Sequence, residues 1–246
     1  MGAFDGQTVI VTGGTRGIGR AISEAFLKGG ASVTAVYSGN KAEAEKFREA
    51  NAPHGARLEI EKLNVADHAE VESFFSNFEQ KHKSLEVLVN NAGIRRDAVL
   101  GMMKEEDWNA VISVNLSGTF NMCKFGVRAM MKNRYGRIIN VTSPSGVFGF
   151  AGQANYAASK AGQVALSKSL AKEVAGRKIT VNCLSPGFIN TDLLADISDE
   201  QKKTYAAQVP VKRFGEPAEV AHCALFLADR NSAYITGTVL EVTGGL

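Results

Sequence analysis

Short runs of β-branched residues alternate with amphipathic helical stretches from one end of the sequence to the other. Parallel strands need long crossover connections, so this alternation predicts a parallel sheet covered by helices on both faces. Right-handed crossovers between about seven strands would make a doubly wound α/β sheet. We expect strands at Thr8–Thr12, Ser32–Tyr37, Arg57–Leu63, Leu85–Asn90, Arg137–Thr142, Ile179–Leu184 and Val239–Val242.

Side-chain caps predict where two of the helices begin. Asn40 stands three residues before Glu43, and Asp67 three residues before Glu70, a variant of the capping-box spacing. The remaining predicted helical segments are Lys104–Asn133, Gln153–Ala175 and Pro217–Leu227, the last opened by its proline.

The composition predicts one soluble domain over residues 1–246. No shift marks a linker, and hydrophobic residues make up 45% of the chain and charged residues 22%. The 28 basic and 25 acidic residues are scattered, so we expect no nucleic-acid partner. No apolar run is long enough for a membrane span and no leader is evident, so we expect a cytoplasmic protein.

Three cysteines, Cys123, Cys183 and Cys223, lie in apolar segments without the spacing of metal ligands. We therefore expect them to fill space in the core and expect no metal site.

A glycine-rich turn follows the first predicted strand. Gly13, Gly17 and Gly19 have GxxxGxG spacing and open a helix. Glycines let the backbone approach a pyrophosphate, whose charge the helix N-terminus then stabilises. A plain strand-to-helix turn is the alternative, but the position after the first strand favours nucleotide binding.

The end of the second strand bears on the choice of nucleotide. An acid there would bind a free ribose 2′-hydroxyl, but the chain has Tyr37 and Ser38. Arg16, inside the glycine turn, could bind a 2′-phosphate. These residues favour NADPH over NADH, although Arg16 could also be an ordinary surface arginine.

A tyrosine and a lysine share one helix face in the segment NYAASK. Reduction of a ketone needs a proton donor, and the charge of Lys160, one turn after Tyr156, would lower the pKa of that phenol. Such pairs also occur by chance, but alanines around this pair leave room for a ligand. Ser143, thirteen residues upstream at a strand end, could bind a substrate oxygen.

Several motifs in order resemble the classical branch of the short-chain dehydrogenase/reductase family over essentially the whole chain. They are TGGTRGIG at 12–19, NNAG at 90–93, Asn115 in the long helix, Ser143 before Tyr156, and SPGFINTD after the sixth strand. The resemblance implies a Rossmann-type doubly wound fold that binds NADPH/NADP+.

The resemblance also implies a role for each matching residue. Tyr156 would be the general acid, Lys160 would lower its pKa and bind the ribose, Ser143 would polarise the carbonyl, and Asn115 would hold a relay water. Ser145 is a rival to Ser143 at a shorter interval, and Pro144 lies between them. The implied cofactor-binding residues are Gly13, Gly14, Thr15, Arg16, Gly17, Ile18, Gly19, Ser38, Asn64, Val65, Asn91, Ala92, Gly93, Tyr156, Lys160, Pro186, Gly187, Ile189 and Thr191.

Within the family the chain is most similar to bacterial 3-oxoacyl-(acyl-carrier-protein) reductases and acetoacetyl-CoA reductases. Motifs such as GQANYAASKAG and PVKRFGEPAEVA carry this likeness. It implies that Arg134 and Arg177 lie beside the active-site mouth and meet the acyl-carrier protein or coenzyme A. The alternative is that these arginines only balance helix dipoles. Residues 191–215 are expected to form an irregular lid, and the assembly a homotetramer.

The leading interpretation is NADPH-dependent reduction of a 3-oxoacyl thioester. One alternative keeps the chemistry and changes the substrate, to acetoacetyl-CoA in polyhydroxyalkanoate synthesis or to another secondary alcohol. A remote alternative is a binding protein that has kept the fold and lost the chemistry.

Overall fold

The computed structural model describes residues 2–191 and 198–246 and contains one seven-stranded sheet. All six strand pairings are parallel, in the order β3-β2-β1-β4-β5-β6-β7. The strands are β1 (Thr8–Thr12), β2 (Ser32–Tyr37), β3 (Leu58–Lys62), β4 (Val87–Asn90), β5 (Gly136–Val141), β6 (Ile179–Pro186) and β7 (Val239–Val242).

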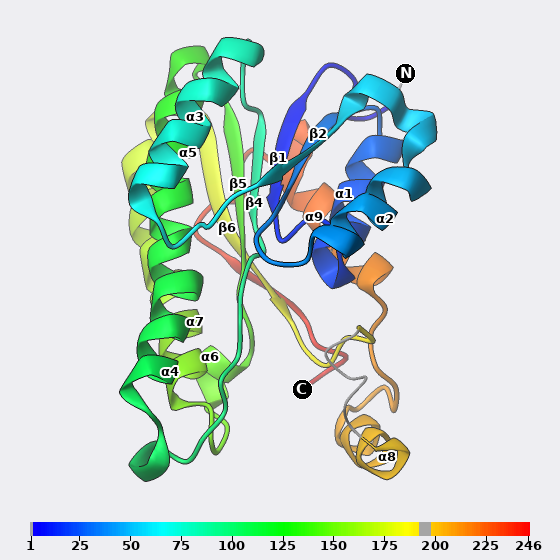
Figure 1. Cartoon of the computed structure of the whole chain (residues 1–246), viewed down its shortest axis with the longest axis vertical. Coiled ribbons are helices and arrows are strands. Elements are labelled where there is room, and N and C mark those ends of the chain that lie inside the picture. Colours follow the sequence, from blue (N-terminus) through cyan, green and yellow to red (C-terminus); the bar gives the residue numbers. More distant parts are fainter. Residues whose placement is uncertain (1, 192–197) are drawn as a thin grey trace.

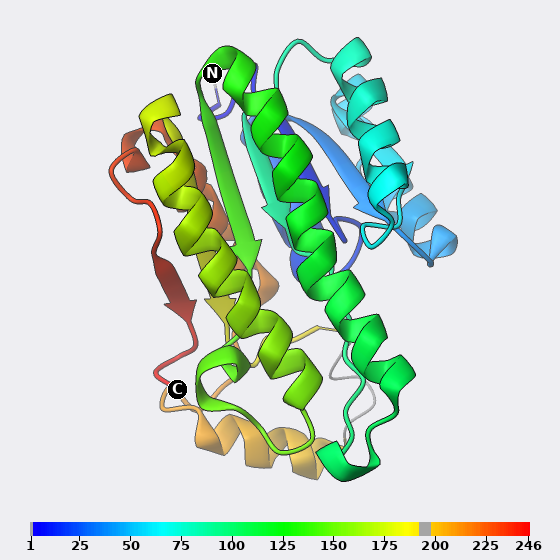
Figure 2. The ribbon, with the colours of Figure 1, turned by 90° about the vertical axis from the view of Figure 1, so that its left-hand side faces the viewer.

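Helices cover both faces of this sheet. One layer holds α1 (Gly17–Lys28), α2 (Lys41–Ala50) and α9 (Pro217–Ala228), and the other holds α3 (His68–Lys81), α5 (Gly118–Asn133) and α7 (Ala154–Val174) (Figure 1). Figure 2 shows α5 and α7 lying along one face of the sheet. The predicted doubly wound α/β fold is confirmed.

The two faces of the sheet are buried in separate hydrophobic clusters. Alternate strand residues point to opposite faces, so Val9 and Val11 pack with Phe26 of α1, whereas Ile10 packs with Met122 of α5. Burial on both faces explains why the central strands are almost continuously apolar.

The predicted strands differ little from those in the structure. β1, β2 and β7 have the predicted bounds, and the other strands begin or end one or two residues away. Arg57, predicted to open β3, is instead the last residue of the short helix η1 (Ala52–Arg57), and its guanidinium donates hydrogen bonds to the carbonyls of Leu27 and Ala31.

Both predicted side-chain caps form, but α3 lacks the second, reciprocal hydrogen bond of a capping box. The Asn40 side chain accepts a hydrogen bond from the Glu43 amide, and Asp67 accepts from the amides of Ala69 and Glu70. Glu70 in turn accepts from the Asn64 amide, not from that of Asp67. The cap of α3 is therefore one-sided, and the acid ties the β3–α3 loop instead.

The predicted helical stretch Lys104–Asn133 is present in three parts. Helix α4 (Glu105–Val111) passes into a π-helical segment, η3 (Ile112–Ser117), and then into α5. π-Helical turns occur frequently at functional sites. Here the turn contains Asn115.

Other elements were not predicted. Helix α8 (Asp199–Gln208) lies within the segment expected to be irregular, so that expectation is wrong for these residues. Residues 192–197 of the expected lid lie outside the described part of the chain. The remaining short elements are α6 (Ser145–Phe148), η1 (Ala52–Arg57), η2 (Leu100–Met102), η4 (Ala175–Arg177) and η6 (Arg230–Ser232).

The winding of the sheet reverses at β1, which lies between β2 and β4. Ligands of doubly wound sheets bind outside the carboxyl ends of the strands at such a point. The end of β1 is therefore where a nucleotide site is expected.

Candidate active site

The glycine turn lies at the carboxyl end of β1, and α1 begins at Gly17. A Cβ atom built on Gly19 would lie 2.0 Å from the Gly13 carbonyl oxygen, so no other residue fits where α1 meets the turn. The backbone is thus cradled as a pyrophosphate site requires, which fits the implied dinucleotide.

The end of β4 is fastened to this turn. The Asn91 side-chain amide donates to the carbonyls of Thr12 and Gly13, at 3.1 and 3.2 Å. The Thr12 hydroxyl accepts from the amides of Asn91 and Ala92, both at 3.0 Å. Asn91 therefore helps to set the distance between two strand ends, and the cofactor contact predicted for it stays a prediction.

The two residues predicted to favour NADPH over NADH lie at the surface of the protein. The side chains of Arg16 and Ser38 are exposed, in the β1–α1 and β2–α2 connections. The Lys46 ammonium is the main group that lowers the pKa of Glu43 in α2, and the charge of Arg16 contributes to the same lowering. Arg16 thus lies close enough to the start of α2 for its charge to act there.

Other predicted cofactor positions surround the same edge. The Thr191 methyl lies 3.6 Å from where a Gly17 Cβ would be, which brings the end of the β6 connection to the glycine turn. Ile189 is buried and pairs with Gly215 through the backbone, and the Gly187 amide donates to the Val242 carbonyl. Thr15 and Gly14 are buried within the turn, whereas Gly13 and Ile18 are half-buried.

Helix α5 holds one of the two residues predicted to contact the adenine, Val65. Val65 is buried, and its carbonyl accepts a hydrogen bond of 2.9 Å from the Asn121 side chain. Asn64 is exposed, and its side-chain oxygen accepts from the Ala66 amide at 3.1 Å. Asn121 is a supporting residue that the sequence did not single out.

The predicted catalytic residues converge from β5 and α7. Ser143 follows β5, and its hydroxyl lies near enough to Tyr156, in the first turn of α7, to lower the pKa of the phenol. Lys160 is 4% exposed, and its ammonium donates to the Val141 carbonyl at 2.8 Å. The Lys160 nitrogen lies 5.5 Å from the centroid of the Tyr156 ring.

Burial is the largest influence on the pKa values of Tyr156 and Lys160. It raises the pKa of Tyr156, and the Ser143 hydrogen bond and the Arg95 charge offset the rise only in part. Burial also lowers the pKa of Lys160 to about 8. Desolvation therefore outweighs the favourable charges at Tyr156 in this structure, and the lowering of its pKa expected from Lys160 stays a prediction.

Asn115 lies fully buried in the π-helical segment. Its side chain accepts from the Ile94 amide at 2.8 Å and donates to the Ile94 carbonyl and the Ser159 hydroxyl. Its backbone carbonyl accepts from Thr119 at 2.7 Å and from the Gln163 side chain at 2.9 Å. The relay water implied for Asn115 stays a prediction.

Ser145 and Pro144 open α6 in a way that the sequence left undetermined. Pro144 is in the right-handed helical region, and its carbonyl accepts from the amides of Val147 and Phe148. Ser145 is 5% exposed and hydrogen-bonds Ser143. A proline at a helix start is the signal that could have predicted α6.

The two arginines predicted beside the active-site mouth are elsewhere in this chain. Arg134 ends α5 and Arg177 follows α7, and the Arg134 guanidinium donates to the Gly176 carbonyl. The 21 residues of α7 span about 30 Å, and Tyr156 is at the other end. Within one chain, Arg134 and Arg177 therefore do not lie beside the active site as predicted. The carboxyl ends of their helices face the amino ends of the strands, whereas the site is at the carboxyl ends.

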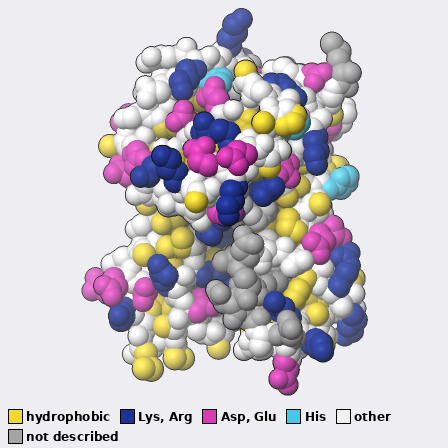
Figure 3. Space-filling view, turned by 45° about the vertical axis from the view of Figure 1, so that its right-hand side comes forward, with side chains coloured by type: hydrophobic (Ala, Val, Ile, Leu, Met, Phe, Trp, Pro, Cys, Tyr) yellow, Lys and Arg dark blue, Asp and Glu magenta, His cyan; other side chains and the backbone are white. Residues whose placement is uncertain are grey.

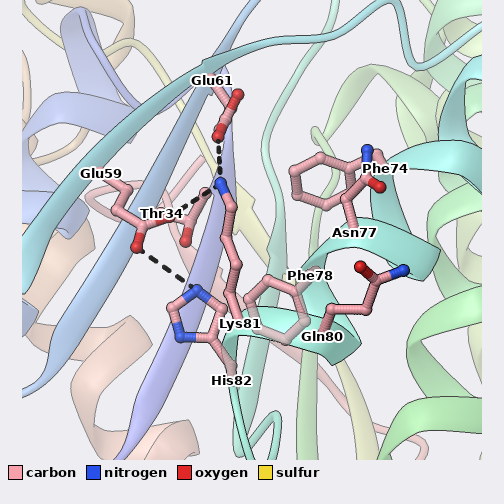
Figure 4. A pocket seen from close by; sticks show the side chains of 9 residues that line it. All are labelled: Thr34, Glu59, Glu61, Phe74, Asn77, Phe78, Gln80, Lys81 and His82. Atoms are coloured by element: carbon pink, nitrogen blue, oxygen red, sulfur yellow. Dashed lines mark hydrogen bonds and ion pairs between the residues drawn. The ribbon is translucent and has the colours of Figure 1, made fainter.

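A separate pocket lies between β3 and α3 (Figure 4). Lys81 pairs with Glu61 and Glu59 there, and His82 with Glu59. The carboxyl end of α3 forms one wall, so this pocket is not at the glycine turn.

Acidic and basic side chains are interspersed over the face in Figure 3. Among residues 2–191 and 198–246, no helix is long and apolar enough to cross a bilayer. The same residues contain no cluster of three or more His, Cys, Asp or Glu side chains that could hold a metal. The three cysteines are free: Cys123 and Cys183 are buried and Cys223 half-buried.

We predict that Gly146→Ala lowers the free energy of unfolding by about 1–3 kcal/mol, the usual cost of overpacking. A Cβ atom there would lie 2.7 Å from the Ala161 amide nitrogen, in the backbone next to Lys160. Gly101→Ala is the control, because nothing lies within 4 Å of its Cβ position. Urea unfolding of both variants at one protein concentration measures the effect, and equal stabilities would contradict it.

We also predict that the difference in free energy of unfolding between Lys160→Met and the wild type depends on pH. The folded pKa of about 8 lies below the ordinary 10.5, so the unfolded chain binds more protons between these values. The stability of the wild type should therefore rise with pH there, relative to Lys160→Met. Unfolding of both proteins from pH 7 to 10 checks this, and a constant difference would refute the buried lysine's low pKa.

Comparisons with known proteins agree with this geometry. A family model described as enoyl-(acyl carrier protein) reductase matches residues 13–246. Proteins named 3-oxoacyl-(acyl-carrier-protein) reductase FabG are similar throughout: those of Salmonella typhimurium (46% identity, 99% of this chain, 98% of the relative), Escherichia coli (47%, 99%, 98%) and Thermotoga maritima (43%, 99%, 98%). The chain belongs to the short-chain dehydrogenase/reductase family.

Proposed function

We propose that this protein is an oxidoreductase that reduces a 3-oxoacyl thioester to the 3-hydroxyacyl thioester with NADPH, as in fatty-acid synthesis. The observation that carries the proposal is that Ser143 after β5 and Tyr156 and buried Lys160 at the start of α7 come together at the carboxyl ends of the strands. The names of the full-length relatives support the same substrate class.

The chain's own residues supply the proton. When bound, the reduced nicotinamide supplies a hydride to the carbonyl carbon. Ser143 donates a hydrogen bond to the carbonyl oxygen, and Tyr156 gives that oxygen its proton as negative charge develops. A tyrosine is protonated at neutral pH in any case, and burial, which raises the pKa of Tyr156, keeps the proton on the phenol until negative charge develops on the carbonyl oxygen.

The glycine turn would hold the cofactor's pyrophosphate against the start of α1. Arg16 and Ser38, exposed at the rim, would bind the 2′-phosphate of NADPH. Lys160, Asn91, Ala92, Gly93 and the β6 connection with Pro186, Gly187, Ile189 and Thr191 would hold the nucleosides and the nicotinamide.

Apolar side chains beside the site fit an acyl substrate. Val147 and Phe148 of α6 are 70% and 60% exposed, and Met102 of η2 is 80% exposed. The Ala98 amide donates to the Gly152 carbonyl, which brings the segments before η2 and after α6 together. The carrier is an acyl-carrier protein or coenzyme A.

A homotetramer would give Arg134 and Arg177 a docking role. In a two-fold pairing through α5 and α7, helices of the two copies run antiparallel. Arginines at the carboxyl ends of one copy would then approach the other copy's active-site edge. Exposed Phe120 and Met131 on α5 support such a contact. A cytoplasmic location is part of the same proposal.

We predict that Tyr156→Phe lowers kcat for NADPH-dependent reduction of acetoacetyl-CoA by at least about 100-fold, the usual share of a general acid. Tyr234→Phe, on a fully exposed tyrosine, is the matched control. Full activity of Tyr156→Phe would overturn the role.

The same assay should include acetoacetyl-acyl-carrier protein, crotonyl-CoA and simple secondary alcohols. Turnover of the alcohols alone would contradict a 3-oxoacyl substrate. Reduction of crotonyl-CoA alone would assign the chain to enoyl reduction, the activity in the family model's description. No turnover of any of them would favour a binding protein.

We predict that Arg16→Ala raises KM for NADPH at least about tenfold and leaves KM for NADH nearly unchanged, since a charge-assisted hydrogen bond is worth about 1.5–3 kcal/mol. Arg48→Ala removes an equal charge from α2, where Arg48 pairs with Glu45, and should change neither constant. A similar rise for both cofactors would contradict recognition of the 2′-phosphate.

A further inference from the structure

An ion pair outside the predicted catalytic set lies against the Tyr156 ring. The Arg95 guanidinium carbon is 5.8 Å from the ring centroid. Arg95 is paired with Asp97 through two hydrogen bonds. Both residues follow β4 in the chain, and neither contributes to the cofactor cradle described above.

A continuous series of hydrogen bonds joins this ion pair to Ser143. Asp97 accepts from the Gln153 side-chain amide at 3.2 Å, and the Gln153 oxygen accepts from the Ser145 hydroxyl at 3.1 Å. The Ser145 hydroxyl accepts from Ser143 at 3.2 Å, and Ser143 also accepts from the Ser145 amide at 3.2 Å.

The polarity of this series is fixed at one end. A carboxylate only accepts, so Gln153 must present its amide nitrogen to Asp97 and its oxygen to Ser145. Ser145 then donates to Gln153 and has lone pairs free for the Ser143 hydroxyl. The Ser143 hydroxyl hydrogen points to Ser145, and the second lone pair of Ser143 is free on the side of Tyr156. Binding of the ketone would turn that hydrogen to the carbonyl oxygen, while the Ser145 amide keeps the Ser143 oxygen in place.

The loop that carries Arg95 and Asp97 is held in place on three sides. The Ile94 amide donates to Asn115, the Arg96 carbonyl accepts from Asn155 at 2.9 Å, and the Ala98 amide donates to Gly152 at 2.9 Å. Asn155 is fully buried and directly precedes Tyr156. The ion pair is thus positioned by the residues that position the catalytic tyrosine.

We propose that Arg95, Asp97, Gln153 and Ser145 form a positioning chain that orients the Ser143 hydroxyl and holds a second cation against Tyr156. None of the four donates a proton or hydride to the substrate. The inference rests on the proposed role of Tyr156 as proton donor. It adds Arg95 to the electrostatic support for the phenolate that the sequence assigned to Lys160.

The charged and titratable groups around Tyr156 come from four elements. Lys160 lies on α7 and Cys183 beside it on β6. Asp97 is the main group that raises the pKa of Arg95, and the charge of Tyr205 in α8 raises it as well. After burial and the Ser143 hydrogen bond, Arg95 is the charge that lowers the pKa of Tyr156, and Asp97 raises it.

A spectroscopic titration tests the cation without any turnover. The absorbance of tyrosinate is followed from pH 8 to 12, and the Tyr156→Phe signal in the same background is subtracted. Arg95→Met removes the cation and leaves Asp97 unpaired, so the midpoint of Tyr156 should rise by at least about 0.5 pH unit. Arg95→Lys should restore much of it.

Arg96→Met is the matched control. Arg96 is the next residue, carries the same charge and pairs with Asp107 at 3.8 Å on the outside of the loop. It should leave the midpoint within about 0.2 pH unit of the wild type. An equal shift for Arg95→Met and Arg96→Met, or no shift for either, would overturn the role of Arg95.

Kinetics of NADPH-dependent acetoacetyl-CoA reduction test the hydrogen-bond chain. Ser145→Ala and Gln153→Met should each lower kcat about tenfold with little change in KM or Tm, the cost of about one hydrogen bond. Their double variant should lose no more than either single variant, because both break one chain. Additive losses, or losses confined to Tm and KM, would contradict the chain.

The titration separates failure of this inference from failure of the proposed function. An inactive wild type whose Tyr156 midpoint still depends on Arg95 would refute the reductase assignment alone. An active wild type whose Tyr156 midpoint is unchanged in Arg95→Met would refute only the inference.

Discussion

The hydrogen bond from the Lys160 ammonium to the Val141 carbonyl is the contact on which the geometry of the site depends. Val141 ends β5 two residues before Ser143, and Lys160 is one helical turn after Tyr156. This one bond therefore ties the helix that carries the phenol to the strand that carries the serine. Gly146 lets α6 approach the same turn of α7 closely enough to touch its backbone. The hydroxyls of Ser143 and Tyr156 meet as a result.

Burial of this bond has an electrostatic cost that shapes the chemistry. An ammonium in the interior is desolvated, which lowers the pKa of Lys160 to about 8. Burial of the phenol itself raises the pKa of Tyr156, so it holds its proton more firmly than an exposed tyrosine does. The product phenolate then needs support from nearby charge. Arg95 provides some, with its guanidinium carbon 5.8 Å from the ring centroid and its charge partly balanced by Asp97.

Much of this arrangement could be predicted from sequence because it follows from local patterns. The strands are set by apolar periodicity, the helix caps by Asn40 and Asp67, and the meeting of Ser143 with Tyr156 by the end of β5 and the start of α7. The rest depends on contacts between segments far apart in the chain. The burial of Tyr156 and Lys160 is invisible in the spacing of NYAASK, so its effect on their pKa values could not be predicted. The distance of Arg134 and Arg177 from the site depends on helix direction, which motif matching ignores.

The most direct test of the account is the fate of a deuterium label. Acetoacetyl-CoA is reduced in ordinary water with NADPH deuterated at the transferred position, and the product is analysed by mass spectrometry. Hydride transfer to the carbonyl carbon, with the proton supplied through Tyr156, predicts one carbon-bound deuterium per 3-hydroxybutyryl-CoA, at C3. A 3-hydroxy product without deuterium, or a label found only in a saturated acyl chain formed from added crotonyl-CoA, would contradict it.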